Sequence, residues 1–311
     1  MSKNNHHVVL LSHSAETADE INRQHTNFKH LPNISLATKL TATNQLTADI
    51  FTGIDVIFVA TPSIATLAVV EKIKHFNLSA DIGFVLCSKG LDGNNLQLFS
   101  QIFVRNFSQN DFAILSGPNF ANEVAQGLPT VTTIATTNKR FFNKIAATLQ
   151  NQQFSCYYSH DIITTELCGI MKNIIAIGCG IVDGIGLGEN AKAALVHRGV
   201  VEIVRFAKVI NGKKVAADLV NPAGFGDIFL TCGAKKSRNN SLGYEMGCGK
   251  AFANIIKTNN KTYEGAISAQ AIAKLSAKYA VELPLCNFIA KAIGGSYTAD
   301  QIAKELIKVI L

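Results

Sequence analysis

Residues 54–90 read IDVIFVATPSIATLAVVEKIKHFNLSADIGFVLCSKG and contain a strand pattern, a helix pattern and a second strand pattern in succession. The runs at 54–60 and 84–87 are almost continuously apolar, as in strands whose sheet is covered by helices on both faces. Between them, apolar side chains recur at helical spacing across residues 64–75. This order predicts a βαβ unit and therefore a mostly parallel sheet.

The same alternation extends to both sides of this unit, as far as residue 157. Further strands are expected at 8–11, 113–115, 131–135 and 154–157, and further helices at 15–23, 95–105 and 140–150. From about residue 159 the strand signals fade, and helices are expected at 162–181, 191–209, 241–257, 266–279, 284–292 and 299–310. The sequence therefore predicts a Rossmann-like, doubly wound α/β domain at residues 1–157 and an all-helical domain at residues 158–311.

The composition is typical of a two-domain globular protein of the cytoplasm. The 311 residues are 48% hydrophobic and 16% charged, which is enough apolar material for two cores. The seven cysteines are widely spaced and include no CxxC pair, which indicates reduced thiols rather than disulfides or a zinc site. No apolar run approaches the roughly 20 residues of a membrane-spanning helix, and the first 14 residues lack a signal-peptide pattern. We therefore expect no membrane insertion.

The formal net charge of +7 leaves two interpretations open. It fits a mildly basic surface, and it fits attraction for an anionic ligand. Binding to nucleic acid is not expected, because lysine and arginine are scattered and no basic run carries interleaved aromatic residues.

The most informative segment for chemistry is ELCGIMKNIIAIGCGIVDG, residues 166–184. Between Glu166 and Asp183, Lys172 is the single charged residue, and a helix that is apolar all round is buried. A lysine that extends past the core to solvent is the plain structural alternative. A buried amine is costly unless it is paired or functional, and burial favours the neutral form that proton exchange requires. This segment predicts a catalytic lysine at position 172.

A second polar segment is GFGDIFLTCGAKKSRNN, residues 224–240. Asp227 stands at an expected helix start, where its carboxylate could merely cap the helix. Further along, Ser237, Arg238 and Asn239 place a hydroxyl, a guanidinium and an amide side by side in an expected polar loop. These groups suit a phosphate site, and they equally suit a solvated turn.

A third segment is LSGPNFANEVAQGLPT, residues 115–130, which directly follows an expected strand. Gly117 and Pro118 make a sharp turn, and Asn119 stands near the start of a helix, whose backbone N–H groups attract anions. Lys89 follows another strand at the carboxyl end, where open α/β sheets bind ligands. Each feature alone is also compatible with an ordinary strand–turn–helix corner.

Taken together, these segments resemble the soluble NAD(P)-dependent glycerol-3-phosphate dehydrogenases. Three motif blocks carry the resemblance: GPNFANE…GLPT at 117–130, GIMKNIIAIGCGIVDGIGLGENAKAALVHRG at 169–199, and GFGDIFLTC…SRNNSLG at 224–243. INRQHTNFKHLPNISL at 21–36 and TYEG at 262–265 are similar to two further stretches of the family. The blocks occur in the family's order from about residue 7 to the C-terminus.

The resemblance implies reduction of dihydroxyacetone phosphate to sn-glycerol 3-phosphate by NADH or NADPH, a step that supplies glycerophospholipid synthesis. By position, Lys172 resembles the proton donor and acceptor, with Asn173 beside it, and Lys89 and Asp227 resemble its polar partners on the substrate oxygens. The remaining substrate contacts would be Gly117, Asn119, Ser237, Arg238 and Asn239. The cofactor would lie against His13, Lys89, Ala121, Arg238 and Glu264. The helical second domain of such enzymes often serves self-association, so a homodimer is one expectation.

One family motif is missing from the sequence. The family begins with a strand and a GxGxxG turn that holds the cofactor pyrophosphate, and no such glycine pattern precedes VVLL at 8–11. Instead, HHVVLLSHSAETADEIN at 6–22 is similar to the family's second strand and the helix that comes after it. We therefore expect one βα unit of roughly 25 residues to be absent, which would leave two inner strand edges unpaired.

Three hypotheses for function remain open. The first is a working dehydrogenase whose N-terminus lies upstream of the given sequence and supplies the glycine-rich turn. The second is a non-catalytic remnant that still binds phosphorylated metabolites or a partner, and the third is a related two-domain reductase with another substrate. The choice between NADH and NADPH stays open, because Ser12 and His13 at the ribose position are neither acidic nor strongly basic.

Overall fold

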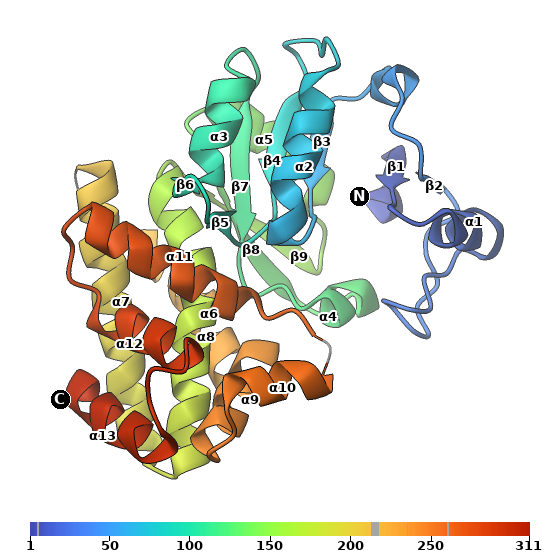
Figure 1. The fold of residues 1–311 in the computed structure, drawn as a ribbon. Helices are drawn as coiled ribbons and strands as arrows, with labels where there is room; N and C mark the ends of the chain where they lie inside the picture. Colours follow the sequence, from blue (N-terminus) through green and yellow to red (C-terminus); the bar gives the residue numbers. More distant parts are fainter. Residues whose placement is uncertain (5, 213–217, 235, 260) are drawn as a thin grey trace.

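The computed structural model describes residues 1–4, 6–212, 218–234, 236–259 and 261–311. The chain folds into a half that contains the strands and a half that consists of helices (Figure 1). The strands end at Ser159, and the first long helix begins at Ile162. The change of secondary structure therefore falls close to the expected domain boundary, which itself stays a prediction.

The main sheet has five strands in the order β3-β4-β7-β8-β9. Neighbouring strands are parallel except for the pair β7 and β8, so the expected mostly parallel sheet is confirmed. The strands are β3 (Val56–Val59), β4 (Gly83–Leu86), β7 (Phe112–Ser116), β8 (Thr130–Ala135) and β9 (Phe154–Ser159).

Helices cover both faces of this sheet, as the apolar strand runs predicted. Side chains alternate along β4: Phe84 and Leu86 pack with the helices α2 (Ser63–Lys74) and α3 (Phe99–Asn106). Val85 packs on the opposite face with α5 (Lys139–Leu149). Since successive side chains of a strand point to opposite faces, a strand buried on both sides must be apolar throughout.

An N-terminal unit stands apart from this sheet, at the right of Figure 1. We call N-terminal unit the strand β1 (Val8–Leu11), the helix α1 (Ala15–Gln24) and the strand β2 (Leu40–Thr43). In the described part of the chain, β1 pairs only with β2, and β3 pairs only with β4. The two unpaired inner edges expected from the sequence are therefore present.

The N-terminal unit is held by little buried surface. Its buried apolar residues are Ala18, Ile21 and Ala42, and Leu10 and Leu11 of β1 are 38% and 41% exposed. A short turn of 3₁₀ helix, η1 (Ser2–Asn4), precedes it. The Asn4 amide donates hydrogen bonds to the carbonyl oxygens of residues 148, 149 and 150 at the end of α5, at 3.1–3.2 Å.

Several short elements connect the sheet. β5 (Leu91–Asp92) and β6 (Gln97–Leu98) form a small hairpin, so the helix expected at 95–105 begins only at residue 99. The prediction was wrong there because the Asp92 side chain accepts hydrogen bonds from residues 94 and 95 and folds the chain into a turn. The other short elements are α4 (Ala121–Gln126) and the 3₁₀ turn η2 (Ala48–Phe51).

The helical half is built around α6 (Ile162–Ile185), which begins at the cap residue Asp161. Every residue from Thr164 to Val182 is buried except Lys172. α6 is long and apolar enough to cross a membrane by length and composition, which corrects the expectation that no such run exists, but it lies inside the helical half. The surrounding elements are α7 (Glu189–Asn211), α8 (Asp227–Gly233), α9 (Arg238–Gly247), α10 (Phe252–Asn259), α11 (Glu264–Lys278), α12 (Pro284–Ile293) and α13 (Ala299–Ile310), with short turns η3 (Asp218–Val220) and η4 (Pro222–Gly226).

Glycines allow α6 and α9 to touch through their backbones. A Cβ atom on Gly180 of α6 would overlap the backbone of residue 240, and one on Gly243 of α9 would overlap the carbonyl oxygen of Ile177. The single helix expected at 241–257 is instead two helices, α9 and α10. Gly249, at a φ of 90°, turns the chain between them in a conformation that glycine adopts readily.

Candidate active site

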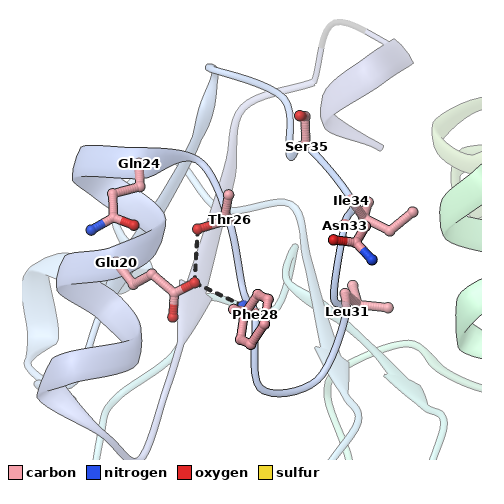
Figure 2. Close-up of a pocket in the computed structure, with 8 residues that line it drawn as sticks. All are labelled: Glu20, Gln24, Thr26, Phe28, Leu31, Asn33, Ile34 and Ser35. Atoms are coloured by element: carbon pink, nitrogen blue, oxygen red, sulfur yellow. Dashed lines mark hydrogen bonds between the residues drawn. The ribbon is translucent and has the colours of Figure 1, made fainter.

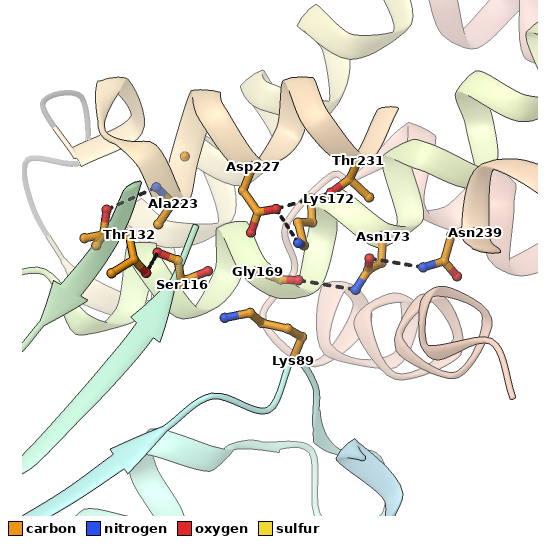
Figure 3. A network of polar contacts seen from close by, with 12 residues as sticks. Lys89, Ser116, Thr132, Gly169, Lys172, Asn173, Ala223, Asp227, Thr231 and Asn239 are labelled. Carbon is orange, nitrogen blue, oxygen red and sulfur yellow. Dashed lines mark hydrogen bonds and ion pairs between the residues drawn. The ribbon is translucent and has the colours of Figure 1, made fainter. Parts of the chain in front are cut away.

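The centre of the site is an ion pair between two of the motif blocks. Lys172 belongs to the block at 169–199 and Asp227 to the block at 224–243. Lys172 of α6 and Asp227, the first residue of α8, lie with Nζ and Oδ1 2.5 Å apart (Figure 3). Their side chains are 12% and 2% exposed. Thr231, one turn along α8, donates a hydrogen bond to the same oxygen at 3.3 Å. Lys172 is therefore a paired, largely buried amine, and not a lysine that extends past the core to solvent.

The second carboxylate oxygen of Asp227 is buried and has no hydrogen-bond partner in the described part of the chain. A buried carboxylate oxygen without a donor is costly, so this atom is available to a ligand that brings a hydroxyl group. Asp227 thus does more than cap a helix: one oxygen accepts a hydrogen bond from Lys172, and the other has no donor among the described residues.

Lys89 enters the site from the opposite half of the molecule. It follows β4, and its Nζ donates a hydrogen bond to the carbonyl oxygen of Leu115 at 2.7 Å. Burial, joined by the positive charge of Lys172, lowers the pKa of Lys89 to about 8, and the negative charge of Asp227 opposes both effects. A Cβ atom on Gly169 of α6 would lie 2.9 Å from the Lys89 side chain. Glycine at 169 therefore makes room for a second lysine beside Lys172.

The turn after β7 contributes further unpartnered polar atoms. Both amide atoms of Asn119 and the hydroxyl of Ser116 are buried and have no hydrogen-bond partner among the described residues. Gly117 lies against β8, where a Cβ atom would come within 3.0 Å of the Val131 carbonyl oxygen and of Thr132. The backbone of this turn is thus held by β8 while its side chains stay free for a ligand.

A chain of amides connects α6, the helix that carries Lys172, to its neighbours. Asn239 donates a hydrogen bond to the Asn173 side chain at 3.1 Å and accepts one from the Gly265 backbone at 3.1 Å. Ser237 caps α9, and Arg238 is its first residue and is exposed. The expected polar loop at 237–239 is therefore a helix N-terminus, a position that favours anions.

The residues expected at the cofactor are spread over several elements. Glu264 begins α11, and its carboxylate accepts a hydrogen bond from the backbone N–H of Ser63 in α2 at 3.3 Å, which joins the two halves. Ala121 begins α4 and is exposed, and His13 is exposed in the loop between β1 and α1. The structure thus gathers Lys89, Lys172 and Asp227 in one cluster, while His13 belongs to the N-terminal unit.

A separate hollow lies within the N-terminal unit (Figure 2). The Glu20 carboxylate accepts hydrogen bonds from the Thr26 hydroxyl and the Phe28 backbone at 2.7 Å each, which folds the loop after α1 against the helix. The cavity has a volume of about 410 Å³ and is lined by Glu20, Gln24, Thr26, Phe28, Leu31, Asn33, Ile34 and Ser35. It contains none of the residues of the Lys172 cluster.

Sequence reasoning missed two residues of the site. Ser116 directly precedes the Gly117 turn at a strand end, and Thr231 stands four residues after Asp227 on one helix face. The sequence shows both positions, but serine and threonine are common at strand ends and in short helices, so the positions alone do not indicate a site. Only the burial of their hydroxyls beside charged groups singles them out.

Two family models match most of the chain. The model described as the NAD-dependent glycerol-3-phosphate dehydrogenase N-terminus matches residues 1–142, and the one described as the C-terminus matches residues 161–304. The chain belongs to the NAD-dependent glycerol-3-phosphate dehydrogenase family. The resemblance inferred from the motif blocks is confirmed.

Relatives agree with this family over nearly the whole chain. A glycerol-3-phosphate dehydrogenase (NAD(P)+) of Erythrobacter litoralis is 34% identical over 301 residues, 97% of this chain and 89% of the relative. One of Sphingopyxis alaskensis is 37% identical over 301 residues, 96% and 88% of the two chains. The crystal structure of glycerol-3-phosphate dehydrogenase from Coxiella burnetii matches with a TM-score of 0.91 at 32% identity, covering 99% of this chain and 93% of that one.

Several polar groups around Lys172 are suited to bind the cofactor and substrate of this family. The buried, unpartnered atoms of Ser116, Asn119 and Asp227 are donors and acceptors without protein partners, as expected where ligands bind. At the other end, the described chain has no glycine-rich turn at the unpaired edges of β1 and β3, where this strand order places the pyrophosphate.

Proposed function

We propose that this chain interconverts dihydroxyacetone phosphate and sn-glycerol 3-phosphate with NADH or NADPH. The observation that carries the proposal is the buried Lys172–Asp227 pair, whose second carboxylate oxygen has no protein partner among the described residues. Membership of the glycerol-3-phosphate dehydrogenase family supports the same substrate. We also propose that the enzyme acts in the cytoplasm, supplies glycerophospholipid synthesis and forms a homodimer.

Proton transfer is the role of Lys172. Its ammonium group, held by Asp227 at 2.5 Å, donates a proton to the ketone oxygen during reduction and takes it back during oxidation. Lys89, which enters from the other half, adds a second positive charge near the oxygen that becomes negative. When bound, the nicotinamide ring supplies or accepts the hydride at the adjacent carbon.

Binding of the phosphate is the role of the α9 N-terminus. The exposed guanidinium of Arg238 and the N–H groups after Ser237 favour a dianion. Asn239 and Asn173 hold this helix end next to the catalytic lysine. Gly117 and Asn119 contact the three-carbon part of the substrate from the turn after β7. The cofactor contacts are His13, Lys89, Ala121, Arg238 and Glu264.

The test is oxidation of NADH and of NADPH by the purified chain with dihydroxyacetone phosphate. Lys172→Ala is expected to reduce kcat/KM by about 10²-fold to 10⁴-fold, because the proton donor is lost. Lys192→Ala is the matched control: Lys192 also forms an ion pair, with Asp183 at 2.9 Å, and its side chain is 19% exposed. It should keep most of the activity.

Two results would contradict the proposal. Equal activity of the two lysine variants would remove Lys172 from the chemistry. Absence of turnover in the unmodified chain, together with calorimetric binding of glycerol 3-phosphate, would support the non-catalytic remnant instead.

A further inference from the structure

The hydroxyl of Ser116 is a polar group of the site without an assigned task. Ser116 is the last residue of β7 and is 1% exposed, and its hydroxyl has no hydrogen-bond partner in the part of the chain that the structure describes. Its backbone carbonyl is occupied, because Thr132 of β8 donates a hydrogen bond to it at 3.1 Å. A buried hydroxyl without a hydrogen-bond partner is energetically unfavourable. A bound ligand that hydrogen-bonds to it would remove that cost.

The surroundings of this hydroxyl place it in the catalytic cluster. A Cβ atom on Gly169 would lie 3.3 Å from the Ser116 hydroxyl and 2.9 Å from the Lys89 side chain, so both groups occupy the space above that glycine. Lys172 stands three residues further along α6, less than one helical turn away. In Figure 3, Ser116 and Asn239 lie on opposite sides of the Lys172–Asp227 pair.

The substrate of the proposed function has three groups to be recognised. Its ketone is assigned to Lys172, which Asp227 holds in place, and its phosphate to the end of α9 where Asn239 lies. The remaining group, the free hydroxymethyl, is at the other end of the three-carbon chain. A substrate centred on Lys172 with its phosphate towards α9 therefore directs this hydroxyl towards Ser116.

We propose that the Ser116 hydroxyl binds the free hydroxymethyl group of the substrate and makes the site selective for it. A serine hydroxyl both donates and accepts, so it pairs with an alcohol in either direction. This inference rests on the proposed function, because it names the contact for one end of the same substrate. Ser116 would thus be a specificity residue that touches the substrate, without a part in proton transfer.

The experiment compares Ser116→Ala with the unmodified chain on two substrates. Dihydroxyacetone phosphate carries the hydroxymethyl group, and hydroxyacetone phosphate carries a methyl group in its place. Ser116→Ala should reduce kcat/KM for dihydroxyacetone phosphate by about 10-fold to 100-fold, because the substrate hydroxyl loses its buried partner. Its kcat/KM for hydroxyacetone phosphate should change by less than about 3-fold, so the preference between the two disappears.

Thr132→Val is the control variant. It removes a neighbouring buried hydroxyl that has a protein partner, the Ser116 carbonyl, so it should affect both substrates alike and lower the thermal midpoint Tm. Ser116→Ala should leave Tm unchanged or raise it, because it removes an unpaired polar group. Calorimetric Kd values for both ligands without cofactor give the same comparison without turnover.

Equal losses on the two substrates, or no loss with dihydroxyacetone phosphate, would overturn the role of Ser116 and leave the proposed function intact. A drop in Tm of Ser116→Ala equal to that of Thr132→Val would also overturn it, since the hydroxyl would then be structural. An unmodified chain that neither turns over nor binds dihydroxyacetone phosphate would overturn the proposed function, and this inference with it.

Discussion

The helical half and the N-terminal unit are held together in very different ways. Around α6, one continuous core contains many side chains that are completely buried, and the Lys172–Asp227 pair is embedded in it. In the N-terminal unit, the buried apolar side chains are Ala18, Ile21 and Ala42. The two residues proposed for proton transfer thus lie beside the largest core of the molecule, while the proposed cofactor contact His13 belongs to the unit with the smallest core.

The two regions also differ in how their backbones contact neighbouring elements. α6 and α9 touch at Gly180 and Gly243 without intervening side chains, so neither helix can shift without moving the other. The strands β1 and β3 each leave one edge unpaired, and hydrogen bonds from Asn4 attach the N-terminal unit to the end of α5. The proposed site of proton transfer is therefore held rigidly, while the unit expected to hold part of the cofactor is attached by few contacts.

The largest effect on stability is expected at the contact between the backbones of α6 and α9. Gly243→Ala would place a methyl group on the carbonyl oxygen of Ile177, and we expect it to lower the free energy of unfolding by at least about 3 kcal/mol. Gly233→Ala is the control, because nothing lies within 4 Å of its Cβ position. It should be neutral or stabilising by up to about 1 kcal/mol. Urea unfolding measures both, and similar values would refute the close contact.

A pH-dependent effect of intermediate size is expected at Glu166. This buried carboxyl accepts hydrogen bonds from the Ser100 backbone at 3.2 Å and hydroxyl at 2.5 Å, and so joins α6 to the start of α3. Burial raises the pKa of Glu166 from 4.5 to about 7, against the lowering by its hydrogen bonds. The pKa of Glu166 is higher in the folded protein than in the unfolded chain, so folding favours the protonated carboxyl. The contribution of Glu166 to the free energy of unfolding is therefore complete below about pH 4.5 and is lost as pH rises through about 7.

The expected loss is about 3 kcal/mol between these limits, since each pKa unit corresponds to about 1.4 kcal/mol. Glu166→Gln should remove most of the decline in unfolding free energy between about pH 5 and pH 8. Glu71→Gln, which changes an exposed partner of Lys74, should keep it. A decline of the same size in Glu166→Gln would show that another group is responsible.

The smallest effect is expected at the attachment of the N-terminal unit. Asn4→Ala removes hydrogen bonds to α5 carbonyls, and we expect the opening free energy of the β1 and β2 amides to fall by about 1 kcal/mol. Hydrogen exchange measures this opening, and α6 amides should not change. Asn106→Ala, whose amide binds within α3, is the control without effect on β1. Faster exchange throughout the helical half would contradict the separation of the two regions.

Much of the fold could be predicted because its signals are local. The run VIFVA predicted the strand that became β3, and the apolar run around Lys172 predicted the buried helix α6. Predictions failed where local signals were weak or overridden. β2 (Leu40–Thr43) is short and half polar, and the α9–α10 break depends on Gly249 within an otherwise helical pattern.

By itself, the sequence determined the two-part fold, the family and the identity of Lys172 and Asp227 as candidates, because periodicity and motif order are carried along the chain. Only the tertiary structure decided that these two side chains meet at 2.5 Å across 55 residues, and that Ser116 brings an unpaired hydroxyl beside them. Such contacts depend on how distant helices and strands pack, and no local pattern encodes a distance between them.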